Sequence, residues 1–316
     1  MEKGLGPAKG LSTTKLWVGV GAYVVAAGSA LPPAGPAEAQ TQPHAHTPGH
    51  GAHRATPPQA AGPGGERGHA TGDARAAAAP GQGGEGGEGG EGGERGAADA
   101  LAGLSSDAAY AARLELIRGH LLVGRELLGA GARADAVPHF LHPAEEIYGD
   151  LEPGLRARRV APFRRDLDAL ARAVRDGAGA EEVRKRQAAV ASALDRAAAA
   201  LPAATRSAPG FVAEVAAAVL RSAAEEYAEA VEGDRVANPV EYQDGRGFLR
   251  AAEALLRSHE GALRAKDAEA SEALARAVAQ LGRAWPAARP PAGPALPPGE
   301  VSALVSRIEL AASRLR

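Results

Sequence analysis

The feature that most limits the fold is the helical spacing of apolar residues from Asp107 to the C-terminus. This part of the chain is rich in Ala, Leu, Arg and Glu and has few runs of β-branched residues. Apolar residues that recur every three to four positions are typical of amphipathic helices, and these residue types favour helix. We therefore predict an all-α structure. Because aromatic residues make up only 3% of the chain, its core should consist mainly of Ala, Leu and Val.

The predicted helices form two groups of four. The first group covers residues 107–129, 134–151, 163–176 and 181–201, and the second covers 211–232, 239–258, 266–284 and 301–315. Gly129 to Gly131 should end the first helix, and Pro153-Gly154 the second. Since four antiparallel helices form a bundle, we expect two tandem four-helix bundles, at residues 106–202 and 207–316, or one longer bundle.

The first 39 residues have the three parts of a secretory signal peptide. Basic residues precede an apolar run over residues 16–31, and Ala37-Glu38-Ala39 precedes Gln40. The run is shorter than the about 20 residues that a membrane-spanning helix needs. We expect cleavage after Ala39 and a periplasmic mature protein. The alternative is an uncleaved leader that anchors the chain in the inner membrane.

Residues 40–105 are expected to form a disordered linker. They are mostly Gly, Pro, Ala and Thr, and residues 83–94 repeat Gly-Gly-Glu, so large apolar residues are too few for folding. The segment holds a scattered set of histidines: His44, His46, His50, His53 and His69. Imidazoles on a flexible segment can capture Cu(II), Ni(II) or Zn(II) weakly. A plain spacer is the other interpretation.

Composition limits the chemistry of any metal site. The chain has no cysteine, and its one methionine is Met1. Disulfides, lipid attachment at cysteine, and thiolate sites for zinc, haem or iron–sulfur clusters are therefore excluded. A metal would have to be bound by His, Asp, Glu, Tyr or backbone oxygen. The net charge of −2 gives no reason to expect a nucleic acid as partner.

One short segment gathers side chains that bind metals. His139, His142, Glu145 and Glu146 are separated by three and four residues, so on a continuous helix they share a broad face. Imidazole together with carboxylate suits Zn(II), Fe(II/III), Mn(II) or Cu(II). His120, on the preceding helix, could join them from an antiparallel neighbour. These five residues are the predicted metal site.

The helical wheel of the same segment gives a reason against this site. The apolar stripe from Val137 to Leu151 leaves His139 and Glu146 nearly opposite the core, with His142 and especially Glu145 on its flank. Pro143 can kink the helix and turn the preceding histidine inward. The alternative is therefore a set of exposed or hydrogen-bonded side chains without a metal.

A second group of acids lies in the C-terminal half. Glu225, Glu226 and Glu229 precede Gly233, and Glu241 and Asp244 follow Asn238-Pro239 on the next predicted helix. Carboxylates on facing helices could bind a hard cation. The more usual explanation is a solvated face, balanced here by Arg221, Arg246 and Arg250.

The sequence contains no motif of a known catalytic site. In the predicted helices, no histidine has a glutamate three residues before it, as ferritin-like di-iron sites require. A His-Glu-x-x-His motif, a phosphate-binding Gly-rich loop and a serine nucleophile elbow are also missing. We therefore do not expect an enzyme.

Two segments resemble known families. Phe140-Leu141-His142-Pro143-Ala144-Glu145 resembles the His-x-x-Glu motif of imelysin-like proteins, which are helical extracytoplasmic proteins associated with iron uptake. The resemblance implies that His142 and Glu145 act as a pair. Phe140 stands where that family has glycine, two residues before the histidine.

The second resemblance is to the extracytoplasmic N-terminal region of high-affinity iron permeases. It rests on residues 224–242, with a tyrosine-acid helix, a turn at Gly233 and a restart at Glu241-Tyr242. The Arg-Glu-x-x-Glu motifs of the permease itself are missing from this sequence, so the resemblance implies a helper role and not transport.

We therefore predict a periplasmic, non-enzymatic, helical protein that binds a transition metal, iron or copper. It would serve metal uptake or homeostasis, with a membrane metal transporter as its expected partner. The alternative is a metal-free helical interaction module that docks on a membrane complex, which an exposed apolar patch would reveal.

Overall fold

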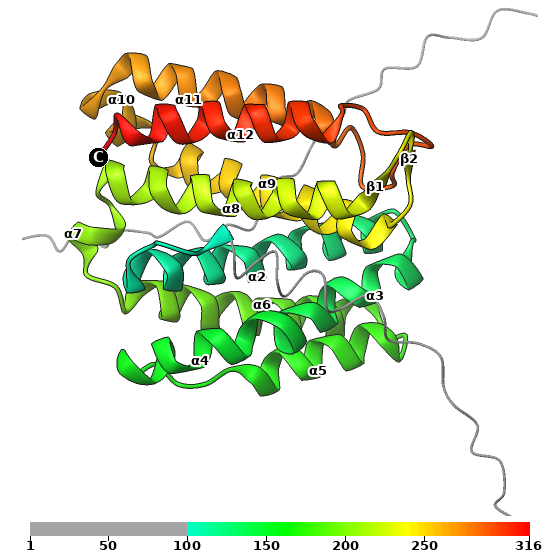
Figure 1. The fold of residues 1–316 in the computed structure, drawn as a ribbon. Helices are drawn as coiled ribbons and strands as arrows, with labels where there is room; N and C mark the ends of the chain where they lie inside the picture. Colours follow the sequence, from blue (N-terminus) through cyan, green and yellow to red (C-terminus); the bar gives the residue numbers. More distant parts are fainter. Residues whose placement is uncertain (1–99) are drawn as a thin grey trace, which may run out of the picture. The chain divides into compact units, whose positions relative to one another are not determined.

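The structure is a computed structural model and describes residues 100–316 (Figure 1). The expected signal peptide and nearly all of the expected linker, with its histidines, lie outside the described residues. The all-α prediction is confirmed: apart from one short hairpin, the regular elements of the described part are helices. None of the described helices combines the length and apolar character that crossing a membrane requires.

The first half of the described chain begins with a long helix that is capped at both ends. Ser105 accepts a hydrogen bond from the Ala108 N–H at 3.2 Å, and Gly131, at φ +73°, follows the helix where the sequence predicted its end. The elements are α2 (Ser106–Gly129), α3 (Arg133–His142), the π-helical turn η1 (Pro143–Ile147), α4 (Tyr148–Ala157), α5 (Arg164–Arg175) and α6 (Ala180–Ala199).

The second half contains a helical hairpin closed by a tight turn. Gly233, at φ +65°, allows β1 and β2 to pair antiparallel, and Asn238 caps the next helix by accepting from the Val240 N–H at 3.1 Å. The elements are α7 (Ala203–Arg206), α8 (Pro209–Ala230), β1 (Val231–Glu232), β2 (Arg235–Val236), α9 (Pro239–Ser258), α10 (Glu260–Lys266), α11 (Ala268–Leu281), the 3₁₀ turn η2 (Gly282–Ala284) and α12 (Pro298–Ser313).

Two predicted helix boundaries are wrong. The second helix does not end at Pro153-Gly154, because burial of Leu151 and Leu155 holds α4 together through Ala157. The helix predicted to start at residue 266 starts at Ala268, because Asp267 is extended and its carboxylate caps α11 by accepting from the Ala270 N–H at 3.0 Å. Lys266 ends α10, a short helix that was not predicted.

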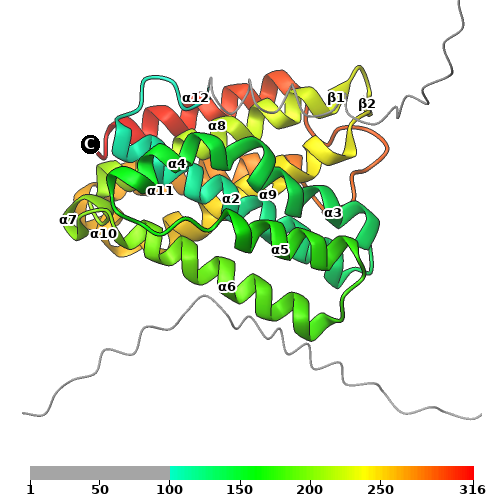
Figure 2. The same cartoon turned by 90° about the horizontal axis from the view of Figure 1, so that it is seen from below.

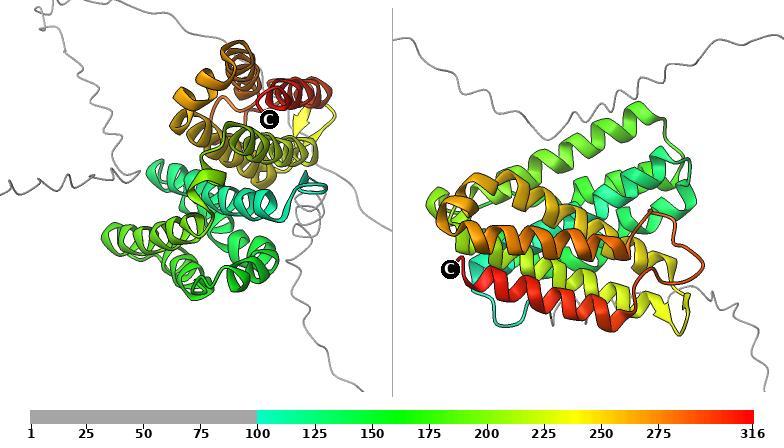
Figure 3. Two further views of the ribbon diagram at one scale, coloured as in Figure 1. Left: turned by 90° about the vertical axis from the view of Figure 1, so that its left-hand side faces the viewer. Right: turned by 90° about the horizontal axis from the view of Figure 1, so that it is seen from above.

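Helix α9 lies in the middle of the described part. It packs on α8 and α2, and more lightly on α3; α12 covers α8, and α11 covers α12. On the other side, α3, α5 and α6 follow α2, as the views from below and along the helices show (Figures 2 and 3). Helix α9 therefore brings side chains of the second half against those of the first.

Two glycines allow α2 and α9 to cross closely. A Cβ atom on Gly247 would lie 2.8 Å from the backbone carbon of Gly119, and one on Gly119 would lie 2.9 Å from the Phe248 nitrogen. Such distances leave no room for a side chain at either of these two positions. This crossing places His120, next to Gly119, beside the polar residues of α9.

An ion pair fixes the same crossing. Arg246 of α9 donates to both carboxylate oxygens of Glu126 on α2, at 3.0 and 2.8 Å, and to the Trp285 carbonyl at 2.5 Å. Arg246 is buried, so the prediction that it balances a solvated acidic face is wrong. Its paired geometry is that of a strong, directional guanidinium–carboxylate contact.

Candidate metal centre

Three histidines converge on one carboxylate. The Nδ1 atoms of His120 and His139 lie 2.5 and 2.7 Å from Asp244 Oδ1, and His142 Nδ1 lies 3.0 Å from Oδ2. His120 comes from α2, His139 and His142 come from α3, and Asp244 comes from α9. One potential ligand atom of each residue lies within 4.8 Å of the other three.

The cluster is shielded from water. His139, Asp244 and His120 are 0%, 1% and 2% exposed, and only His142 is partly open, with 16% of its side chain exposed. The ring of His142 stands edge-on to that of His120, with centroids 5.5 Å apart. Buried polar groups are costly unless each has a partner, and here the shared partner is Asp244.

Small residues bring the three helices close enough for this contact. A Cβ atom on Gly124 would lie 2.8 Å from the Phe140 ring and 3.3 Å from the His139 Cβ. Gly124 lies one turn after His120 on α2, so its lack of a side chain lets α3 approach. Together with the crossing at Gly247, this forms a closed polar site between α2, α3 and α9.

The site combines a charged carboxylate with imidazoles whose pKa values are shifted in opposite directions. Burial would raise the pKa of Asp244, but His120 and His139 hold it well below its usual range. Burial lowers the pKa of His120. Burial would also lower the pKa of His142, but its hydrogen bond to Asp244 and the negative charges of Asp244, Glu146 and Glu241 raise it to about 9.

Both ring nitrogens of His139 have hydrogen-bonding partners. Its Nδ1 faces Asp244 and its Nε2 lies 2.8 Å from Gln243 Oε1, so both ring nitrogens face oxygen atoms. At these distances the nitrogen and the oxygen share a proton, and at Nε2 the Gln243 amide can instead be turned over to donate from its NH2 group. Three Nδ1 atoms directed at one carboxylate therefore provide a ligand set in which a metal ion can replace protons.

The structure brings together three of the five predicted site residues. His120, His139 and His142 form the cluster, and Glu146 lies at its edge, with Oε1 3.7 Å from His142 Nδ1. Glu145 is exposed and lies outside the cluster. The cause is η1, in which the Tyr148 N–H reaches back to the Pro143 carbonyl and the wider turn changes which side chains face α9.

Two expectations about which side chains are exposed are wrong. His139 was expected opposite the core and is fully buried, because α9 covers that side of α3. The acids of the second half were expected on a solvated face, yet Glu226, Glu241 and Asp244 are 5%, 6% and 1% exposed. Charges can be buried there because α9 is covered by α8 on one side and by α2 on the other.

Asp244 is the site residue that the sequence prediction missed. It lies over a hundred residues from His142 in the chain, and a helical wheel shows one helix at a time. A usable signal was present: Gly245 and Gly247 alternate with charged residues, and small residues at such spacing permit close packing around a helix.

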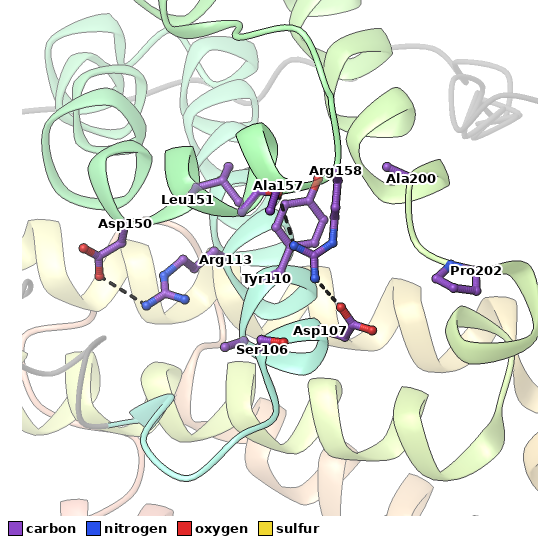
Figure 4. A pocket seen from close by; sticks show the side chains of 12 residues that line it. Ser106, Asp107, Tyr110, Arg113, Asp150, Leu151, Ala157, Arg158, Ala200 and Pro202 are labelled. Carbon is purple, nitrogen blue, oxygen red and sulfur yellow. Dashed lines mark hydrogen bonds and ion pairs between the residues drawn. The ribbon is translucent and has the colours of Figure 1, made fainter.

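A surface hollow of about 590 Å³ lies elsewhere, between α2, α4 and the end of α6 (Figure 4). Its charged groups pair with one another: Arg113 with Asp150 at 3.2 Å, and Arg158 with Asp107. Arg158 also lies 4.2 Å above the Tyr110 ring. These contacts explain the hollow as a structural junction, and it supplies no cluster of metal ligands.

Comparison with known proteins concerns the second half of the chain. Residues 202–315 match the family model of the iron permease-associated 4-helix bundle domain. The segment 224–242 lies inside this range, so the resemblance to an iron-permease region is confirmed; the resemblance to imelysin-like proteins is not shown. No curated protein and no solved structure matches the chain. Asp244 lies inside the matched range, whereas the three histidines precede it.

Proposed function

We propose that the chain is an extracytoplasmic accessory protein of a metal-uptake or homeostasis system that binds iron or copper through His120, His139, His142 and Asp244. The observation that carries this proposal is the convergence of three imidazole Nδ1 atoms on one buried carboxylate, from three different helices. Such convergence across the fold is what a metal site needs and what isolated surface histidines lack.

The ligand set selects a class of ion. Imidazole nitrogen suits iron, copper, zinc and nickel, and a carboxylate oxygen adds affinity for iron and zinc. The match to an iron permease-associated domain favours iron. Copper is the second choice, because its affinity for nitrogen ligands is the highest among these divalent ions.

The environment favours holding an ion over catalysis. The donors face one another within 4.8 Å, and the group is closed apart from the partly exposed His142 and the neighbouring Glu146. A catalytic metal keeps an open position for substrate beside it. We therefore infer a non-enzymatic role in which the ion is bound and passed on.

The sequence and the match to the domain model together support the proposed location and partner. The expected signal peptide would export the chain, and the linker histidines would raise the local metal concentration near the helical part. The name of the matched domain supports a membrane metal transporter as partner.

The metal-free docking module has less support. A docking module of this kind would have a large exposed apolar patch. Within residues 100–316, Leu310, at 69% exposed, is the single large hydrophobic residue on the surface. A converging polar cluster is present instead.

Metal titration tests the proposal. We expect the chain from Gln40 and a shorter form from Ala100, both purified without an affinity tag, each to bind one equivalent of Fe(II) or Cu(II) tightly, with elemental analysis confirming the ratio. The linker should add only weaker Cu(II) binding. Failure of the shorter form to bind iron, copper or zinc would contradict the proposal.

A further inference from the structure

A second group of metal-binding side chains lies beside the histidine cluster. Glu226 and Glu229 on α8 and Glu241 on α9 each place one carboxylate oxygen within 4.8 Å of the other two. Residues three apart share a helix face, so Glu241 and Asp244 lie on one face of α9. The three carboxylates therefore lie on the side of Asp244 that faces α8.

One carboxylate oxygen in this group has no partner. Glu226 is 5% exposed, and its Oε2 is fully buried without a hydrogen bond. Burial raises the pKa of Glu226 well above its usual range, and so do the negative charge of Asp244, a side-chain hydrogen bond with Glu241 and the charges of Glu241 and Glu229. A buried carboxylate without a compensating partner is costly, so this oxygen needs either a proton or a positive ion.

The group opens toward the surface on one side. Glu229 is exposed, whereas Glu241 and Glu226 are 6% and 5% exposed. A cation could therefore reach the buried carboxylates past Glu229 without opening the core. Asp244 of the histidine cluster lies near enough for its negative charge to raise the pKa of Glu226.

We propose that Glu226, Glu229 and Glu241 form a second cation site, built from oxygen ligands alone, beside the histidine site. Hard cations such as Ca²⁺, Mn²⁺ or Fe³⁺ prefer carboxylate oxygen and do not need imidazole. The site goes beyond the proposed function, since it could bind a cation whether or not the histidines do.

The surrounding rings provide a spectroscopic probe. Tyr227 follows Glu226 and Tyr242 follows Glu241 in the chain, and the Trp285 ring lies 5.0 Å from that of Tyr227. Tb³⁺ is a hard cation whose emission is excited by nearby aromatic rings. Tb³⁺ in the acidic repeats at residues 83–94 would lack this signal, because those repeats contain no aromatic residue.

The experiment is a Tb³⁺ titration of the full chain, with excitation of the aromatic residues. Native protein should give emission that saturates near one equivalent and is displaced by Ca²⁺ or Mn²⁺. The double variant Glu226→Gln/Glu241→Gln should bind Tb³⁺ at least tenfold more weakly. Glu214→Gln, which removes one charge elsewhere on α8, should bind like the native protein.

Two further measurements keep the result interpretable. Helical circular dichroism and the melting temperature should be retained in the double variant, because Gln has the shape of Glu and removes repulsion. His142→Ala keeps all three carboxylates, so its Tb³⁺ emission should still saturate near one equivalent. Its affinity should change less than that of the double variant, which separates this site from the histidine site. Absence of saturable emission from the native protein, or equal affinity in the double variant, would overturn the proposal and leave a shared proton as the partner of Glu226.

Discussion

Single replacement of His120, His139 or His142 by Ala is expected to weaken iron or copper binding by about 100-fold or more, which corresponds to about 2.8 kcal/mol. Each imidazole supplies one of the nitrogen atoms that converge on Asp244, so each loss leaves an incomplete ligand set. The measurement is a competition titration with a metal chelator, on the form that begins at Ala100.

Two matched variants serve as controls for this prediction. His259→Ala removes the fourth histidine of the described residues, whose Nδ1 lies 3.0 Å from the Leu255 carbonyl at the end of α9, and should bind metal normally. Glu145→Ala should also bind normally, because Glu145 is exposed and lies outside the cluster. A large loss in Glu145→Ala with none in His120→Ala would favour a His-x-x-Glu pair and contradict the site described here.

Gly247→Ala is expected to destabilise the protein by about 2 kcal/mol or more and to weaken metal binding at the same time. The new Cβ would lie 2.8 Å from the Gly119 backbone carbon and 3.2 Å from Val123 Cγ1, so α2 and α9 must separate. Overpacking of this kind costs about 1–3 kcal/mol and exceeds the gain in helix propensity of about 1 kcal/mol. Separation of the helices also moves His120 away from Asp244.

Urea unfolding and metal titration of the same samples test this prediction. Gly149→Ala is the control, because no atom lies within 4 Å of a Cβ at that position of α4; it should be neutral or slightly stabilising and should bind metal normally. Native stability in Gly247→Ala would show that the close crossing of α2 and α9 is not needed.

Much of the fold follows from local patterns in the sequence. Helix α9 begins and ends where its apolar spacing and the Asn238-Pro239 start signal predicted, because capping and propensity act within one turn. The short helix α10, which buries Leu263, and the continuation of α4 past Pro153 were missed. Both depend on whether tertiary packing outweighs a local signal, and a single helix does not reveal its packing partners.

The site was predictable in part, for a related reason. The histidines could be found because imidazole is a rare and characteristic ligand, and their spacing placed His139 and His142 together. Asp244 was assigned to the acidic group of the second half and not to the histidines, because its contact with them depends on α9 crossing α2 and α3. Glu145 was also predicted as a ligand, but it lies outside the cluster in the structure, where a π-helical turn follows His142.

The most direct test of the central claim is the X-ray absorption spectrum of the form from Ala100 loaded with one equivalent of Fe(II). His120, His139, His142 and His259 are the only histidines in this form. We expect scattering from three imidazole ligands together with oxygen, and a loss of one imidazole in His142→Ala. A shell of oxygen ligands with no imidazole, or a spectrum unchanged by His142→Ala, would contradict a metal site at Asp244.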